Sequence, residues 1–228
     1  MNDNNGALYS LDWKSVKREW PLWVLMLGLV ISAFLVYPHL PEQVPSHWNI
    51  HGEVDGYSSR AFGAFFMPFL AILMYLLLLF LPLLDPRRDN YPRFSKAYTF
   101  LRWSLVVFFS ILYGVTILVA LGYDLNVGMI VKAMVAVLLI IIGNYMGQFR
   151  HNYFVGIRTP WTLANEEVWQ RTHRMGSRIW VLGGFLCLAM APVNTSWAGV
   201  VFFAAIILMA LIPAVYSFII FARLRSSN

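Results

Sequence analysis

The chain has 228 residues, of which 59% are hydrophobic and 12% are charged, and its formal net charge is +6. Soluble domains carry about 25% charged residues and about 45–50% apolar ones. A water-soluble globule of this length would leave too much apolar surface in water, so the composition excludes it and indicates an integral membrane protein. The basic residues are dispersed among hydrophobic segments without a groove-reading motif, so direct nucleic-acid binding is not expected.

Six apolar segments are long enough to cross a hydrocarbon core of about 30 Å, which takes roughly 17–25 helical residues. They lie at residues 21–37, 62–84, 99–123, 127–148, 179–193 and 197–222. Because backbone groups must be paired inside lipid, each segment is expected to be a helix. The predicted fold is therefore all-α: a polytopic bundle of about six transmembrane helices over residues 21–222, between an N-terminal segment 1–20 and a tail 223–228. The first apolar segment lacks a small-residue cleavage site and is expected to stay uncleaved.

The positions of Lys and Arg predict the orientation of this bundle. Basic residues precede the first segment, follow the last, and fill the loops between segments two and three and between four and five. In the three other loops, the only Lys or Arg residue is Arg60. Cytoplasmic loops are enriched in Lys and Arg, so both termini are expected in the cytoplasm. The single cysteine, Cys187, lies in an apolar segment and is interpreted as a small buried hydrophobe.

The outer loop, residues 38–61, contains three prolines followed by two glycines, which predicts an extended segment and then a turn. Alternate side chains of an extended segment share one face. The polar residues that such a face would hold, with the glycine that interrupts it, are His47, Asn49, His51, Gly52, Glu53 and Asp55.

Three interpretations of this loop remain open. Its polar side chains can cap helix ends and pin the loop over the bundle. They can form a binding surface for an extracellular ligand, because loops on rigid scaffolds commonly carry recognition. They can also hold a metal through His47, His51 and a carboxylate, although the spacing matches no recognised zinc or calcium pattern. No cofactor is expected.

The inner loop, residues 149–178, is predicted to contain a short interfacial helix. Thr162 or Asn165 can cap it, Glu166 and Glu167 would occupy its first turn, and Gly176 would end it. A plain membrane-surface helix would account for this segment without further function.

Several side-chain contacts are expected in and beside this helix. Trp169 and His173 are four residues apart and so share a face. Glu167 and Arg171 are spaced as an ion pair. Trp161 and Trp169 are predicted to lie among the lipid headgroups, and Arg158 is predicted to pair with an acidic residue such as Glu166.

Lys132 lies about six residues into the fourth apolar segment from its outer end. A lysine inside a membrane is a functional candidate by default. At this depth it can instead extend outward or pair with Asp124 or an outer-loop carboxylate.

At its two polar loops the sequence resembles the SdpI family of bacterial membrane proteins. The outer stretch LPEQVPSHWNIHGEVDGYSSR is similar to that family's element after the first helix. The inner stretch NYFVGIRTPWTLANEEVWQRTHRMG is similar to its cytoplasmic element, with a Gly-Ile-Arg-Thr-Pro-Trp-Thr core followed by Val-Trp and Thr-His. The resemblance extends from about residue 20 onward and implies a multi-pass protein of the bacterial cytoplasmic membrane.

The resemblance implies immunity against a secreted, membrane-active peptide toxin, and a signal that recruits a transcriptional repressor to the membrane. The toxin-facing candidates are His47, Asn49, Gly52 and Asp55, to which the residue pattern adds His51 and Glu53. The signalling candidates are Asn152, Gly156, Arg158, Thr159, Pro160, Trp161, Trp169 and His173, with Thr162 and Glu166 beside them. The expected partners are the lipid bilayer, the toxin and the repressor.

Two alternatives are a small transporter or lipid-handling protein that uses Lys132, and a membrane metalloenzyme built on His47, His51 and either Glu53 or Asp55. No complete catalytic constellation is visible, so an enzyme is not the leading interpretation and no catalytic residue is assigned.

Overall fold

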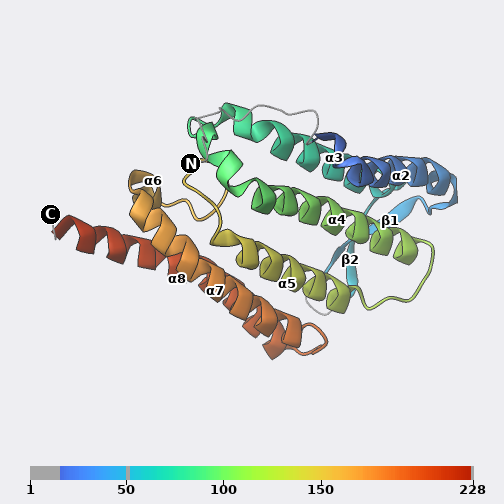
Figure 1. Cartoon of the computed structure of the whole chain (residues 1–228). Coiled ribbons are helices and arrows are strands. Elements are labelled where there is room, and N and C mark those ends of the chain that lie inside the picture. Colours follow the sequence, from blue (N-terminus) through green and yellow to red (C-terminus); the bar gives the residue numbers. More distant parts are fainter. Residues whose placement is uncertain (1–15, 50–51, 227–228) are drawn as a thin grey trace.

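The structure is a computed structural model that describes residues 16–49 and 52–226, and this part of the chain is mostly helical (Figure 1). Its long helices are α2 (Trp20–Val36), α3 (Arg60–Leu84), α4 (Ser95–Ala120), α5 (Val127–Met146), α7 (Glu166–Met190) and α8 (Ser196–Ser226). Short helical segments are η1 (Tyr37–His39), η2 (Arg88–Phe94) and α6 (Pro160–Ala164).

Within the described residues, five helices are long and apolar enough to cross a membrane: α2 with η1, α3, η2 with α4, α5 and α8. By the composition of its helices the chain is therefore a multi-pass membrane protein, as the sequence predicts. Helix α7 is not among the five, because its first half carries charged residues, namely Glu166, Glu167, Arg171, Arg174 and Arg178.

Helix α7 corrects the expectation of a short interfacial helix that ends at Gly176, followed by a separate span. One continuous helix of 25 residues begins at Glu166 and ends at Met190. Gly176 is buried, and an added Cβ would lie 2.6 Å from the Ile157 side chain and 3.1 Å from the Met146 sulfur. The small residue therefore serves close packing inside the helix, and the helix does not end there.

The outer loop corrects the all-α expectation, because it forms a β-hairpin. Strands β1 (Gln43–Trp48) and β2 (Val54–Ser59) pair antiparallel, with Gln43 opposite Ser59. The register shifts on either side of His47, as in a β-bulge. The predicted extended segment and turn are present, but pairing with a second strand was not predicted.

The helices lie side by side in the order α3, α4, α5 and α7, with α2 against α3 and α4 and with α8 against α7 (Figure 1). Helices α5 and α7 run antiparallel: Met146 faces Gly176, Gly143 faces Trp180, and Ile140 faces Gly184. The hairpin lies where the helices end on one side of the molecule, here called the hairpin end, and α6 lies where they end on the other side, the α6 end (Figure 1).

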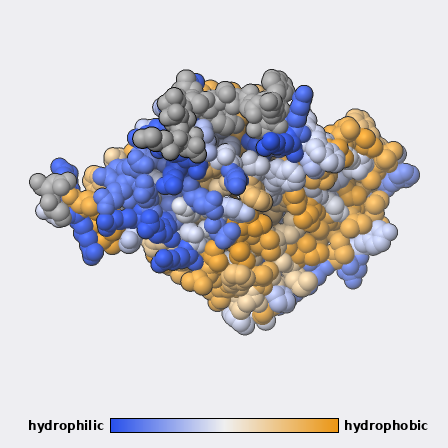
Figure 2. All heavy atoms as spheres, viewed as in Figure 1, coloured by the Kyte–Doolittle hydropathy of each residue, from blue (hydrophilic) through white to orange (hydrophobic). Residues whose placement is uncertain are grey.

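The two ends differ in polarity. Hydrophilic residues gather around α6 and the beginning of α7, whereas hydrophobic residues cover the lengths of the helices (Figure 2). Many apolar side chains on the helices are exposed, among them Leu27, Phe69, Leu182 and Phe203. Such a surface is suited to contact with lipid.

Candidate functional site

The hairpin brings four of its six candidate residues together in two pairs. The His47 Nδ1 and Asp55 Oδ1 atoms are 2.5 Å apart, and both side chains are exposed. Asn49 donates from Nδ2 to Glu53 Oε2 at 3.0 Å and accepts from the Glu53 backbone N–H at 3.1 Å. These contacts stabilise the turn from within the hairpin and cap no helix end, and they leave the His47–Asp55 pair open to solvent.

The turn itself is held by Gly52, whose φ is +82° and whose backbone N–H donates to the Asn49 carbonyl at 2.9 Å. A Cβ on Gly52 would lie 3.3 Å from the Gly128 nitrogen at the start of α5. The hairpin tip therefore packs directly on the bundle. Val44, which is fully buried, anchors the base of the hairpin against Gly63 of α3.

His51 lies outside the described residues. Among the residues that the structure describes, no three His, Cys, Asp or Glu side chains converge as metal ligands.

At the α6 end, Asn152 organises the loop that follows α5. Its side chain is fully buried and makes four hydrogen bonds with backbone groups. Oδ1 accepts from the N–H groups of Phe154 and Val155 at 2.9 and 2.7 Å, and Nδ2 donates to the carbonyls of Arg150 and Val155 at 2.8 and 2.9 Å. A side chain with all its hydrogen-bonding capacity used is a structural residue, and no part of it faces solvent.

His173 links this loop to α7. Its Nε2 accepts a hydrogen bond from the Ile157 N–H at 2.9 Å, and its Nδ1 donates to the Trp169 carbonyl at 2.9 Å. The Trp169 and His173 rings stack with centroids 4.0 Å apart, which confirms the predicted shared face. Gly156 lies against this imidazole: its φ is +115°, and an added Cβ would be 2.3 Å from Nε2.

The arrangement fixes the imidazole in its neutral form. One ring nitrogen accepts a backbone N–H and the other donates to a carbonyl, so a second ring proton would face a donor. Burial lowers the pKa of His173 from 6.5 to about 4. Burial, followed by the nearby Arg87 guanidinium, also lowers the pKa of His151, whose Nε2 contacts the Leu163 carbonyl at 3.2 Å.

Thr159 and Thr162 begin α6 with a reciprocal capping box, and Pro160 is its first residue. The Thr159 hydroxyl also lies 2.9 Å from the Ser217 hydroxyl of α8, and the Trp161 ring packs on Phe218 with centroids 5.0 Å apart. These contacts join the inner loop to the last helix.

Trp169 corrects the expectation that it lies among lipid headgroups. Its side chain is fully buried, and its Nε1 donates to the Phe149 carbonyl at 2.9 Å. The Trp169 indole carries a single polar atom, and that atom has a backbone partner here. The ring can therefore fill the interior of the α6 end.

The exposed charges of the loop behave differently from its buried residues. Arg158 donates from Nη1 to the Tyr153 carbonyl at 2.9 Å, so its partner is a backbone group and the expected pairing with Glu166 is not found. The predicted Glu167–Arg171 pair is confirmed at 2.5 Å. Asn165 caps α7, as one of the two predicted caps, by accepting from Glu167 and Val168 N–H groups.

Two buried acidic residues were missed from the sequence. Asp85, directly after α3, accepts from the Tyr91 hydroxyl at 2.9 Å and from the Tyr153 N–H at 3.0 Å, and so connects the α3–α4 loop with the inner loop. Glu19 forms a buried ion pair with Arg102 of α4 and accepts from the Tyr75 hydroxyl at 2.9 Å. Two sequence signals could have identified them. Glu19 and Asp85 each lie at the border of an apolar segment, and Arg102 lies inside one.

Lys132 donates from Nζ to the Val193 carbonyl at 3.2 Å, in the α7–α8 loop. The three ion pairs between described residues do not include it. Of the two alternatives for Lys132, pairing with Asp124 or a described outer-loop carboxylate is not found, and the side chain extends to the α7–α8 loop instead.

Comparison with known proteins places these features in context. Residues 148–217 match the model of the SdpI/YfhL protein family, and residues 23–72 match a domain of unknown function, DUF1648. The chain is 27% identical over 199 residues to a protein of Bacillus subtilis (strain 168) named immunity protein SdpI, which covers 87% of this chain and 93% of that one. No solved structure matches the chain.

Proposed function

Because the chain is a member of the SdpI/YfhL family and a distant homologue of immunity protein SdpI over most of its length, we propose that it is an immunity protein in a bacterial cytoplasmic membrane. It protects the cell from an extracellular, membrane-active peptide toxin by binding, without enzymatic chemistry. The observation that carries this proposal is the near-complete coverage of the relative, which includes both polar motifs of the structure.

The proposal includes six membrane spans with both termini in the cytoplasm. The second half of α7 is the additional span: it lies beside α5 from Met146 to Ile140, and so at the same depth as a helix that can itself cross the membrane. The arginines of the inner loop, Arg150, Arg158, Arg171, Arg174 and Arg178, support a cytoplasmic location for the α6 end. The hairpin end is then extracellular.

The toxin-facing surface in this proposal is the exposed part of the hairpin, around His47 and Asp55. The signalling surface is the exposed, charged part of the α6 end, around Arg158 and Glu166, where a repressor would be recruited. The buried candidates Asn152 and His173 act by shaping that surface, because their side chains have no access to a partner.

The test is survival of toxin-sensitive bacteria exposed to the peptide toxin from which the family's namesake protects. Cells that express the full chain are expected to survive concentrations that kill cells with an empty vector. A His47→Gln, Asp55→Asn double variant is expected to protect less, at equal membrane abundance.

The matched control is Glu167→Gln, which removes an exposed ion pair of the same length at the opposite end of the molecule. This control is expected to protect fully. Equal killing with and without the wild-type chain would refute the immunity role against that toxin.

A further inference from the structure

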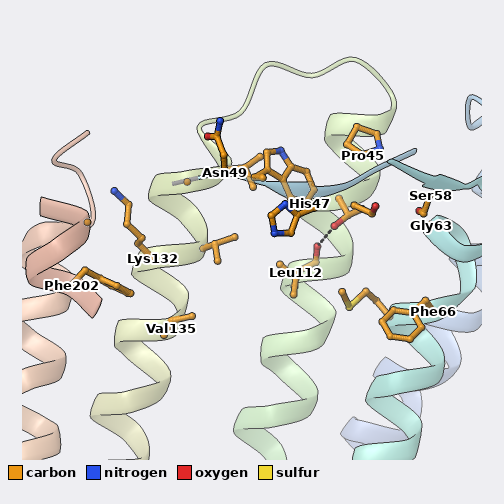
Figure 3. A pocket seen from close by; sticks show the side chains of 18 of the residues that line it. Pro45, His47, Asn49, Ser58, Gly63, Phe66, Leu112, Lys132, Val135 and Phe202 are labelled. Atoms are coloured by element: carbon orange, nitrogen blue, oxygen red, sulfur yellow. Dashed lines mark hydrogen bonds between the residues drawn. The ribbon is translucent and has the colours of Figure 1, made fainter. Parts of the chain in front are cut away.

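A cavity of about 480 Å³ lies beneath the hairpin, between α3, α4, α5 and α8 (Figure 3). This volume is within the range of roughly 300–1,000 Å³ of small-molecule sites. Its walls are largely apolar and include Phe66, Val135, Phe202 and Ile206. Strand β1 forms its edge at the hairpin end.

Lys132 is the cation among the lining residues. It shares α5 with Val135 and lies across from Phe202 of α8 (Figure 3). Its one hydrogen bond to a described residue, the Val193 carbonyl, satisfies one of three ammonium donors. The hairpin carboxylates are engaged elsewhere, Asp55 with His47 and Glu53 with Asn49. A cation at this depth in apolar surroundings is stabilised by an anion that enters the cavity.

Ser58 provides a second polar group. Ser58 also lines the cavity, and its buried Oγ atom has no hydrogen-bond partner in the part of the chain that the structure describes. Buried hydroxyls normally have a partner, and those that lack one call for an explanation.

We propose that this cavity binds a single-chain amphipathic carboxylate of the long-chain fatty acid class. The carboxylate contacts Lys132, and the apolar chain extends past Val135 and Phe202. One lysine matches one negative charge, whereas a phosphate monoester carries about −1.5 to −2. The volume holds one chain, so a two-chain phospholipid does not fit within it. His47 and Asn49, which are toxin-facing candidates, also line the edge of this cavity, but binding of the fatty acid is measured directly and does not depend on immunity.

The test is photolabelling of the full-length protein in phosphatidylcholine nanodiscs with a palmitic acid that carries a diazirine near its methyl end. Mass spectrometry is expected to locate the label on residues around Val135 and Phe202. Excess palmitic acid present during irradiation is expected to reduce labelling, and methyl palmitate is expected not to. Label found on other residues, or an equal reduction of labelling by methyl palmitate, would overturn the proposal. This outcome needs no substitution in the protein.

Two variants sharpen the test. Lys132→Met is expected to raise the half-saturating probe concentration about tenfold, the factor contributed by one charge-assisted hydrogen bond, while Lys132→Arg retains binding. Gly199→Leu is expected to abolish labelling, because Gly199 lines the cavity and open space surrounds its Cβ position.

The matched controls are Lys96→Met, a charge removed from an exposed site, and Gly28→Leu, a leucine added to an open helix surface. Both are expected to label as the wild type does. Unchanged labelling of Lys132→Met and Gly199→Leu would show that the cavity is not the binding site.

Discussion

Acid should destabilise this protein through His173 in a defined pH range. The folded-state pKa of about 4 lies below the usual value of 6.5, so the unfolded chain binds the extra proton first as pH falls. Stability is therefore fully present above about pH 6.5 and is lost progressively down to about pH 4. At about 1.4 kcal/mol for each pH unit, the loss attributable to this imidazole is roughly 3 kcal/mol.

The assay is thermal unfolding of the purified protein in detergent, followed by far-UV circular dichroism at several pH values between 7.5 and 4. His173→Gln retains an oxygen that can accept the Ile157 N–H but does not titrate. Its loss of stability over this range should be smaller by roughly 3 kcal/mol. His39→Gln, at an exposed site, is the control and should follow the wild type. Equal pH dependence of His173→Gln and wild type would refute the reasoning.

Two further changes test the packing of the inner loop and of the buried ion pair at the start of α2. At Gly156, φ is +115° and an added Cβ would lie 2.3 Å from the His173 ring. Gly156→Ala should therefore lower the free energy of unfolding by roughly 3 kcal/mol or more, measured as a lower unfolding midpoint. Gly114→Ala, at an open helix position, is the control and should be neutral or stabilising. Glu19→Gln leaves the buried Arg102 charge without its carboxylate and should cost about 3–5 kcal/mol in unfolding free energy, and an added Arg102→Met should restore much of it; no effect of Glu19→Gln would contradict this.

The spans of the fold were predictable because hydropathy acts over a whole helix. Five predicted segments agree with helices to within a few residues, since long apolar runs have no other stable form in lipid. The break at Gly176 was wrong because a glycine ends a helix only where the chain is free to turn. Here Ile157 and Met146 occupy the space beside it, and these are contacts that no local pattern contains.

The candidate site was predicted in part. The residue types and the pairing of Trp169 with His173 followed from helical spacing, and the helix cap at Asn165 followed from local chemistry. Which side chains are exposed did not follow, because Trp169 and Asn152 are buried by segments distant in sequence. The contacts of Asp85 and Glu19 were missed for the same reason: their partners are 6 to 83 residues away along the chain.

The continuity of α7 restricts how its two ends can move. A helix of 25 residues is about 38 Å long and turns as a stiff rod. At one end Trp169 and His173 are fixed in the inner loop, and further along Trp180 donates to the Met209 carbonyl of α8 at 2.8 Å. An axial twist applied at Gly184 therefore reaches His173 as the same twist. The same continuous helix therefore joins the contacts of the inner loop to those with α8, so a displacement along its axis would move both sets of contacts together.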